Sequence, residues 1–202
     1  MIDGEATAEP TGAFGLLESA IGYALGAVQA VTPQLLHGPT PCAEWDLGTL
    51  LHHLNDALEV LADGSETRRI NAYPSHDACL DGRGDPATDP AAIFNERASR
   101  LRGAWRVAGD RQVITVDGHP LTASAVAAIG AIEIVVHGWD VSQACGQARP
   151  VPEALAIGLL AICPLVVTNA TRHRLFADPV PTSLAASPSD LLIAFLGRTS
   201  PP

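Results

Sequence analysis

Lysine is absent from this 202-residue sequence, and all twelve basic residues are arginines. With twenty-two acidic residues, the formal net charge is -10. A protein that binds a nucleic-acid backbone needs a cationic face that displaces counterions from the phosphates. The charge balance therefore argues against nucleic acid as a partner. An anionic substrate would have to meet a local cluster of arginines.

A long uninterrupted hydrophobic run is also lacking. The apolar segment 13–31 is interrupted by Glu18 and Gln29, and no basic residue precedes it. These features argue against a signal peptide or a membrane span there. No Cys-x-x-Cys pair occurs either, which is typical of free thiols in or near the core of a cytoplasmic protein. The four widely spaced cysteines are Cys42, Cys79, Cys145 and Cys163.

The apolar periodicity predicts an all-α protein, a four-helix bundle with a small β-hairpin and extra C-terminal helices. We expect residues 1–10 to be a disordered leader and residues 11–198 to form a single domain, because this length and 47% hydrophobic residues suit one sizeable core. The predicted helices span about 12–31, 47–62, 89–107, 123–145, 152–167 and 187–196. Helix 152–167 is apolar on nearly every side, so it should be buried or lie in a homodimer contact.

Two connections carry their own signals. The apolar run 113–116 is followed by Asp117-Gly118, a strong hairpin signal, and Pro120 restricts the returning strand to a sheet edge. Residues 64–88 are rich in glycine, aspartate and proline. We expect them to form a long loop that could cover a site as a lid.

Two ionisable side chains interrupt the apolar helix 123–145. At 100° per residue, Glu133 and His137 lie about 40° apart on one face, and Asp140 falls within the same narrow arc. A buried carboxylate or imidazole costs several kcal/mol unless it is paired or bound to a metal. The pair therefore needs a partner from elsewhere in the fold.

The helix 47–62 offers that partner. His53 lies on the side where the apolar arc continues, whereas His52 lies among polar residues, so His53 is the predicted inward histidine. Glu133 and His137 are separated by about 6 Å along their helix axis. With His53 they could bind one divalent metal as three protein ligands and leave a coordination position open, as catalytic metal sites do.

Spacing alone leaves alternatives open. Glu133 could instead hydrogen-bond to His137 or to an arginine, with His53 as an ordinary core histidine. Two histidines and a carboxylate suit iron(II), nickel or manganese as well as zinc. Asp140 could orient the ring of a ligand histidine, or it could be an ordinary salt-bridge partner.

Other side chains are candidates for the surroundings of such a site. Arg172 and Arg174 could hold an anionic group of a substrate, or they could be solvated surface charges. Either Cys42 or Cys145 could be a nucleophile, because both lie near the ligand segments in the sequence. The segment 76–79, His-Asp-Ala-Cys, could supply metal ligands but has no complementary pair nearby.

The tryptophans carry a further expectation. We expect Trp45, Trp105 and Trp139 to pack in the core, although Trp139 adjoins the ligand helix and is a candidate for contact with substrate.

The segment Trp45-Asp46-Leu47-Gly48-Thr49-Leu50-Leu51-His52-His53-Leu54 and the later Glu133-x-x-x-His137-Gly138-Trp139-Asp140 together resemble a known family. This is the metal-binding domain of the mycothiol-dependent maleylpyruvate isomerase family, within the DinB-like group of four-helix metalloproteins. In that pattern a tryptophan precedes the liganding histidine by eight residues, which selects His53 and leaves Glu133 and His137 at the other two ligand positions. The likeness spans about residues 11–198, and the tail is similar to an actinobacterial branch of uncharacterised members. We expect no counterpart in this chain of the isomerase's additional C-terminal domain.

The resemblance implies a divalent metal, with zinc first and nickel, iron or manganese as alternatives, and a mycothiol-like thiol as cosubstrate. A cationic metal favours the thiolate, which could attack an electrophilic carbon of a small molecule and give transfer or isomerisation. If water fills the open position, the same site could support hydrolysis. The alternative from another class is a non-catalytic metal- or ligand-binding module.

Overall fold

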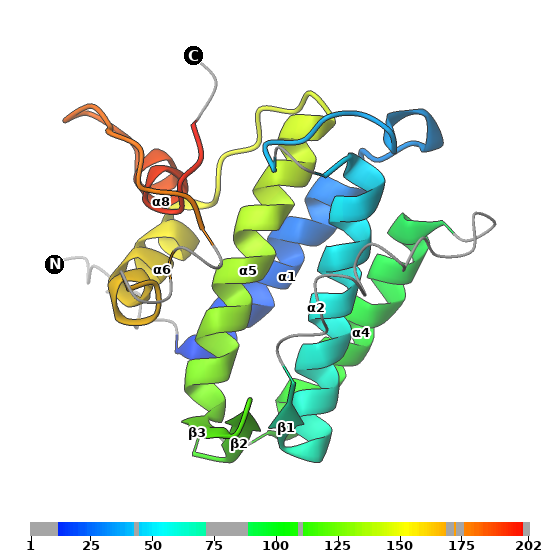
Figure 1. Ribbon diagram of the computed structural model, residues 1–202, viewed down its shortest axis with the longest axis vertical. Coiled ribbons are helices and arrows are strands. Elements are labelled where there is room, and N and C mark those ends of the chain that lie inside the picture. The colour runs from blue at the N-terminus through cyan, green and yellow to red at the C-terminus, as the bar shows by residue number, and fades with distance from the viewer. Residues whose placement is uncertain are drawn as a thin grey trace, which may run out of the picture.

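The computed structural model describes residues 12–42, 45–71, 89–108, 111–168, 172 and 176–199. Four long helices lie side by side as a bundle, and two shorter ones pack against each other beside it (Figure 1). The DinB-like all-α prediction is thereby confirmed. The bundle helices are α1 (Ala13–Val28), α2 (Leu47–Thr67), α4 (Pro90–Val107) and α5 (Ala123–Ala144), and the additional ones are η1 (Pro33–Leu35), α6 (Glu153–Val166) and α8 (Pro188–Phe195).

A three-stranded sheet closes one end of the bundle (Figure 1). The predicted hairpin consists of β2 (Val113–Val116) and β3 (His119–Thr122), and both residues of its turn have positive φ, 47° at Asp117 and 84° at Gly118. The strand that contains Pro120 lies at the sheet edge, as predicted. The prediction missed β1 (Arg69–Ile70), which pairs in parallel with β2, because two residues carry no readable periodicity.

Helix α2 is longer than predicted. Asp46 caps its start by accepting a hydrogen bond from the Thr49 backbone N–H at 2.8 Å. The predicted end near residue 62 is wrong, because the helix runs on to Thr67 and stops at Arg68, whose φ is 61°. Gly64 serves packing, since a Cβ there would collide with the Ile70 side chain. The predicted loop therefore begins later, and residues 72–88, with the proposed lid, lie outside the described residues.

Helix α5 is the central helix of the core. It is long and apolar enough to cross a membrane by length and composition, but 78% of its most apolar window is buried inside the protein. Gly138 brings it close to α1, because a Cβ at this position would lie 3.1 Å from the Ala24 Cβ. A helix that is apolar on nearly all sides can be accommodated by such burial against neighbouring helices.

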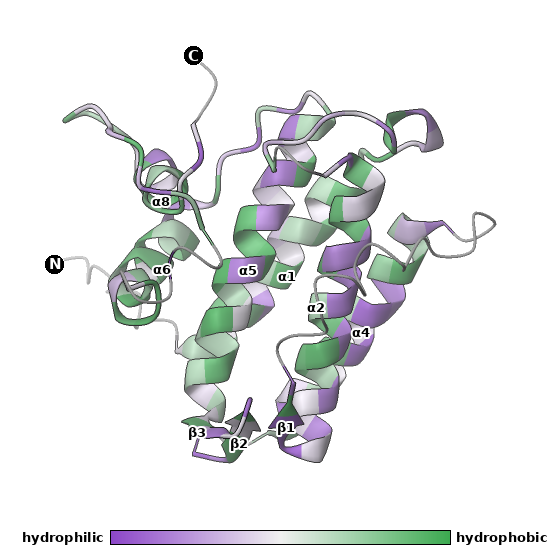
Figure 2. Cartoon of the chain, in the orientation of Figure 1, coloured by the Kyte–Doolittle hydropathy of each residue, from purple (hydrophilic) through white to green (hydrophobic). Residues whose placement is uncertain are grey.

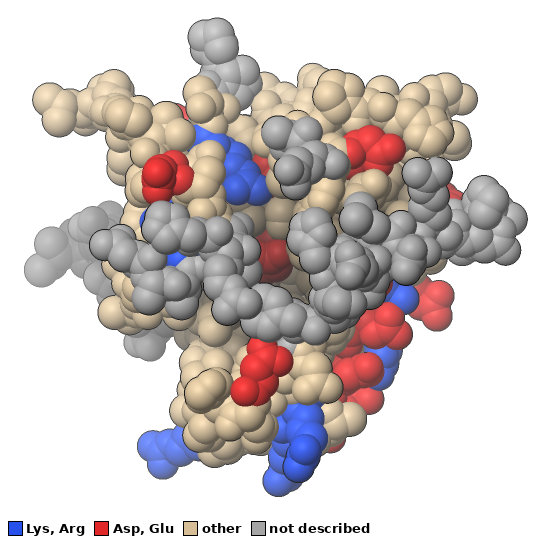
Figure 3. Space-filling model, viewed as in Figure 1, with Lys and Arg blue, Asp and Glu red and all other residues tan. Residues whose placement is uncertain are grey.

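Charged side chains gather where α2 and α4 run side by side (Figures 2 and 3). Arg97 of α4 pairs with Asp56 at 3.2 Å and with Glu59 at 2.6 Å, and Arg100 pairs with Glu66 at 3.0 Å. Exposed pairs of this kind contribute about 0–1 kcal/mol each. The apolar faces of the helices therefore decide the packing.

Helix α6 is buried on one face only. Leu155, Leu159 and Cys163 are buried, whereas Ile157 and Leu165 are 53% and 77% exposed. An apolar exposed face agrees with the alternative that we predicted for this helix, a contact with a second copy. That homodimer stays a prediction.

Candidate metal centre

Helices α2 and α5 bring one carboxylate and two imidazoles together. The Nε2 atom of His53 lies 2.8 Å from Oε1 of Glu133, and Nε2 of His137 lies 3.1 Å from the same oxygen. The two rings stand almost perpendicular, at 83°, with centroids 5.0 Å apart. The structure thus assembles the three residues selected from the sequence, and it places His53, not its neighbour His52, against α5.

The donor set fits a divalent ion. Its three ligand atoms all lie within 4.8 Å of one another. Metal–nitrogen and metal–oxygen bonds of about 2.0–2.2 Å at a tetrahedral ion place neighbouring donors about 3.3–3.6 Å apart. The observed separations of 2.8 and 3.1 Å require only small side-chain movements to reach that spacing. Two imidazoles and one carboxylate also match the ligand types that such ions take in proteins.

Asp140 fixes the orientation of one candidate ligand. Its Oδ2 atom lies 3.1 Å from Nδ1 of His137, and its side chain is completely buried. A carboxylate on one ring nitrogen holds the tautomer and directs the other nitrogen toward the metal. Asp140 therefore makes the contacts that both roles left open by the sequence require, one with the His137 ring and one in a buried ion pair.

The partner in that ion pair is Arg198, which follows α8. Its Nη2 lies 2.9 Å from Oδ2 of Asp140 and its Nε lies 3.3 Å from Oδ1, so the guanidinium spans both carboxylate oxygens. Only 9% of its side chain is exposed. Sequence reasoning missed Arg198, because a lone arginine in the C-terminal tail has no spacing that relates it to α5.

Cys42 lies on the same side of this cluster. Its Sγ is 3.2 Å from Oδ2 of Asp140, 3.2 Å from Nη2 of Arg198 and 3.9 Å from Nδ1 of His137. Cys42, His137 and Asp140 thus form a second group with metal-ligand chemistry. The Arg198 guanidinium already supplies a positive charge there, so a metal ion would have to compete with it. The group around Glu133 is therefore the better candidate for the metal.

Trp45 packs against the core as expected, and it also lies beside the histidines of the centre. It is half-buried, and its ring centroid lies 4.7 Å from that of His53 and 6.0 Å from that of His137. Trp105 and Trp139 are buried as predicted, at 5% and 4% exposed. Trp139 packs in the core, so contact with substrate is not supported for it.

The ligand arc of α5 runs from the core to the surface, whereas the helical wheel predicts that it points inward throughout. Exposure of the side chain is 0% at Asp140, 9% at His137 and 26% at Glu133. One turn further toward the start of the helix, Ile129 is 40% exposed. Among the three ionisable residues, Glu133 is therefore the most exposed.

Electrostatics favour a charged pair at the centre. Burial alone would raise the pKa of the Glu133 carboxyl, but attraction to His137 and hydrogen bonds from both imidazoles outweigh it and hold that pKa well below its ordinary value. Burial would likewise lower the pKa of His137, but Glu133 and Asp140 raise it well above its ordinary value. The pKa of Asp140 is lowered against its burial by His137 and Arg198. A metal ion at the centre would have to displace a proton from His137.

The remaining candidates lie elsewhere. Arg172 is buried and donates hydrogen bonds to the carbonyl oxygens of Ala177 and Phe195 at 3.0 and 2.8 Å, so it holds the C-terminal segment and is not free to bind a substrate anion. Burial raises the pKa of the Cys145 thiol, which argues against a nucleophile there. Arg174 and the segment 76–79 lie outside the described residues.

Two histidines and a glutamate converge from facing helices of the bundle. This arrangement places the chain in the class of DinB-like helical bundles with a candidate metal centre. Residues 17–142 match the family model described as the mycothiol maleylpyruvate isomerase N-terminal domain. This match covers more than half of the chain and includes His53, Glu133 and His137. The chain belongs to this family.

Relatives and a solved structure agree with the assignment. Two uncharacterised proteins of Mycobacterium tuberculosis, from strains CDC 1551 / Oshkosh and ATCC 25618 / H37Rv, are each 27% identical over 166 residues, which is 81% of this chain and 85% of theirs. The crystal structure of the mycothiol-dependent maleylpyruvate isomerase is similar with a TM-score of 0.57 and 19% identity, over 74% of this chain and 67% of that one. At this identity the structural likeness shows the fold alone.

Proposed function

We propose that the protein is a divalent-metal-dependent enzyme that uses a low-molecular-weight thiol, such as mycothiol, for transfer or isomerisation on a small electrophilic substrate. The observation that carries this proposal is the convergence of two imidazole nitrogens on one carboxylate oxygen, 2.8 and 3.1 Å away, on a partly exposed arc of α5. Three protein donors leave room for a further ligand, as in catalytic sites.

His53, Glu133 and His137 would hold the metal, with zinc first and nickel, iron or manganese as alternatives. A bound divalent ion supplies the positive charge that favours a thiolate over a thiol. Asp140 would keep Nε2 of His137 available by accepting a hydrogen bond from the Nδ1–H group. Trp45 covers the rings of both histidines on one side and limits the access of water there.

The proposal of a thiol cosubstrate is supported by the family. The solved relative is named for its dependence on mycothiol, and the family model carries the same name. The match leaves about a third of the isomerase's chain without a counterpart, since 67% of it is covered. We therefore infer a thiol cosubstrate, but we do not assign maleylpyruvate as the substrate. The cytoplasmic location expected from the sequence is part of the same proposal.

The test is a thiol titration of the cobalt(II)-loaded protein under anaerobic conditions, followed by assays with a panel of electrophiles. A thiolate on the metal should add a charge-transfer band in the near ultraviolet, and at least one electrophile should turn over with mycothiol. A cobalt spectrum that is unchanged by thiol, without turnover, would instead favour a non-catalytic binding module. Turnover of an ester or amide without thiol would favour a hydrolase.

A further inference from the structure

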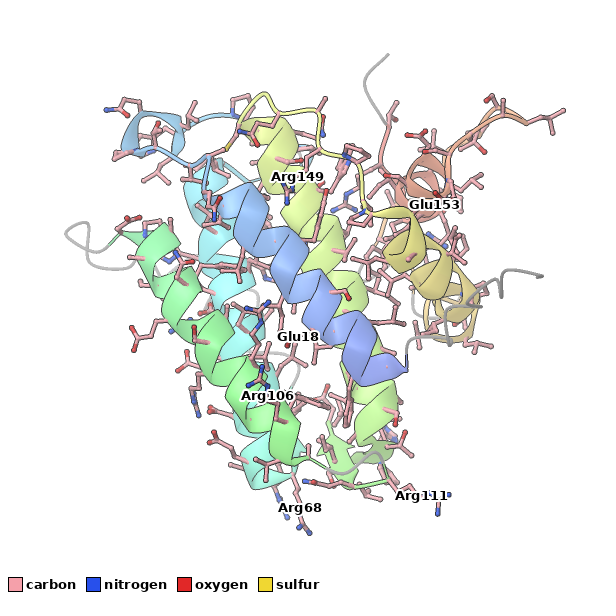
Figure 4. All side chains as sticks on the ribbon, turned by 180° about the vertical axis from the view of Figure 1, so that it is seen from behind. Glu18, Arg68, Arg106, Arg111, Arg149 and Glu153 are labelled. Atoms are coloured by element: carbon pink, nitrogen blue, oxygen red, sulfur yellow. The ribbon has the colours of Figure 1, made fainter. Side chains whose placement is uncertain are left out.

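A groove of about 510 Å³ lies between α1 and α4, away from the candidate metal centre. It belongs to the face seen from behind in Figure 4, where both helices are in front. Its floor is apolar and tightly packed: Leu17, Ile21, Leu101 and Trp105 line it, and each is at most 5% exposed. The volume is within the range of about 300–1,000 Å³ that small-molecule sites occupy.

The groove follows from how the bundle is paired. Helix α1 packs mainly along α5 and α4 packs mainly along α2, so the seam between α1 and α4 is less closely filled. Arg102 bridges this seam with its Nε 3.0 Å from Oε1 of Glu18. Figure 4 shows Glu18 on α1 and Arg106 on α4 at the same seam.

Charge distinguishes this groove from an ordinary packing gap. Glu18 is already paired with Arg102, whereas Arg106 is exposed and forms no ion pair or hydrogen bond with the residues that the structure describes. The lining therefore carries one surplus positive charge, in a protein whose net charge is -10. A cation at the rim of an apolar concavity complements an anionic group on an apolar body.

We propose that this groove binds a small amphiphilic carboxylate, with an alkyl or aromatic body on the apolar floor and its carboxylate on Arg106. The site goes beyond the proposed function, because it shares no residue with the metal centre. Burial of each methylene should tighten binding by up to about fourfold, so octanoate should bind up to about 15-fold more tightly than hexanoate. Added salt should weaken the contact with Arg106.

The test is calorimetric titration of octanoate and 1-octanol into the full-length protein. Arg106 is exposed, and an exposed ion pair contributes at most about 1 kcal/mol, so wild type should bind octanoate up to about fivefold more tightly than octanol. Arg106→Gln should remove that difference. Arg111→Gln is the matched control, because Arg111 is an exposed arginine outside the groove. Its binding of octanoate should equal that of wild type.

A carboxylate could also bind at a metal ion, so the titrations are repeated with His53→Ala. The proposal expects unchanged octanoate affinity in that variant, whether or not the metal centre exists. Loss of binding in His53→Ala with normal binding in Arg106→Gln would overturn it. Equal losses in Arg106→Gln and Arg111→Gln, or no binding by wild type, would overturn it as well.

Discussion

The buried pair of Asp140 and Arg198 gives the sharpest quantitative prediction. Asp140→Asn keeps the size of the side chain but removes its charge, and it leaves a guanidinium that is only 9% exposed without a counter-charge. Breaking a buried pair in this way costs about 3–5 kcal/mol. For a chain of this length each kcal/mol lowers Tm by about 2–4 °C, so we expect a fall of roughly 6–20 °C.

The assay is urea unfolding in the presence of a chelator, followed by circular dichroism, so that metal binding does not contribute to the free energy of unfolding. The double variant Asp140→Asn/Arg198→Met should lose much less than the sum of the two single losses, because no unpaired charge remains. Additive single effects, or a loss below about 1 kcal/mol in Asp140→Asn, would refute the coupling. Without chelator, Asp140→Asn should also weaken metal binding by about 10–100-fold.

Three further predictions follow from packing and burial. Gly64→Ala should lower the free energy of unfolding by about 1–3 kcal/mol, because the new Cβ meets Ile70, whereas Gly103→Ala in the open interior of α4 should raise it by about 0.5–1 kcal/mol; urea unfolding of both variants checks this. Burial raises the pKa of the Cys163 thiol to about 12, so iodoacetamide at pH 8 should modify Cys163 only after unfolding. Mass spectrometry measures the labelling, and rapid labelling of the native protein would contradict this prediction. Burial also raises the pKa of Tyr23 to about 12, despite opposing contacts with Ser142 and an arginine. The unfolded chain loses this proton near pH 10 and the folded chain keeps it, so about 2–3 kcal/mol of stability should be lost between pH 10 and 12. Tyr23→Phe should reduce that loss. An equally steep loss of stability in the variant would contradict this prediction.

The fold was readable from the sequence where a long helix repeats its pattern. Phase along α2 separates His53 from His52, and phase along α5 places Glu133 and His137 on one arc, so the three residues could be selected before any coordinates. The predictions that were wrong concern local features, such as the end of a helix. Gly64 signals a helix end, but it provides close contact with a strand that is too short to predict.

The surroundings of the centre could not be predicted for a different reason. Trp45, Cys42 and Arg198 come from connections and from the tail, where no period relates them to α5. Their approach depends on how these segments fold back over the bundle, which is a tertiary property. Arg172 is the opposite case, a residue selected from the sequence as a possible anion-binding group. In the structure it donates hydrogen bonds to backbone carbonyl oxygens.

The central claim is that side chains of α2 and α5 bind one divalent ion, and metal stoichiometry tests it most directly. Purified wild type and His52→Ala, the matched control on the neighbouring position, should each bind one zinc ion per chain in equilibrium dialysis with elemental analysis. His53→Ala, with its helical circular dichroism unchanged, should bind at least tenfold more weakly. Equal zinc binding in all three proteins, or none in wild type, would contradict the account.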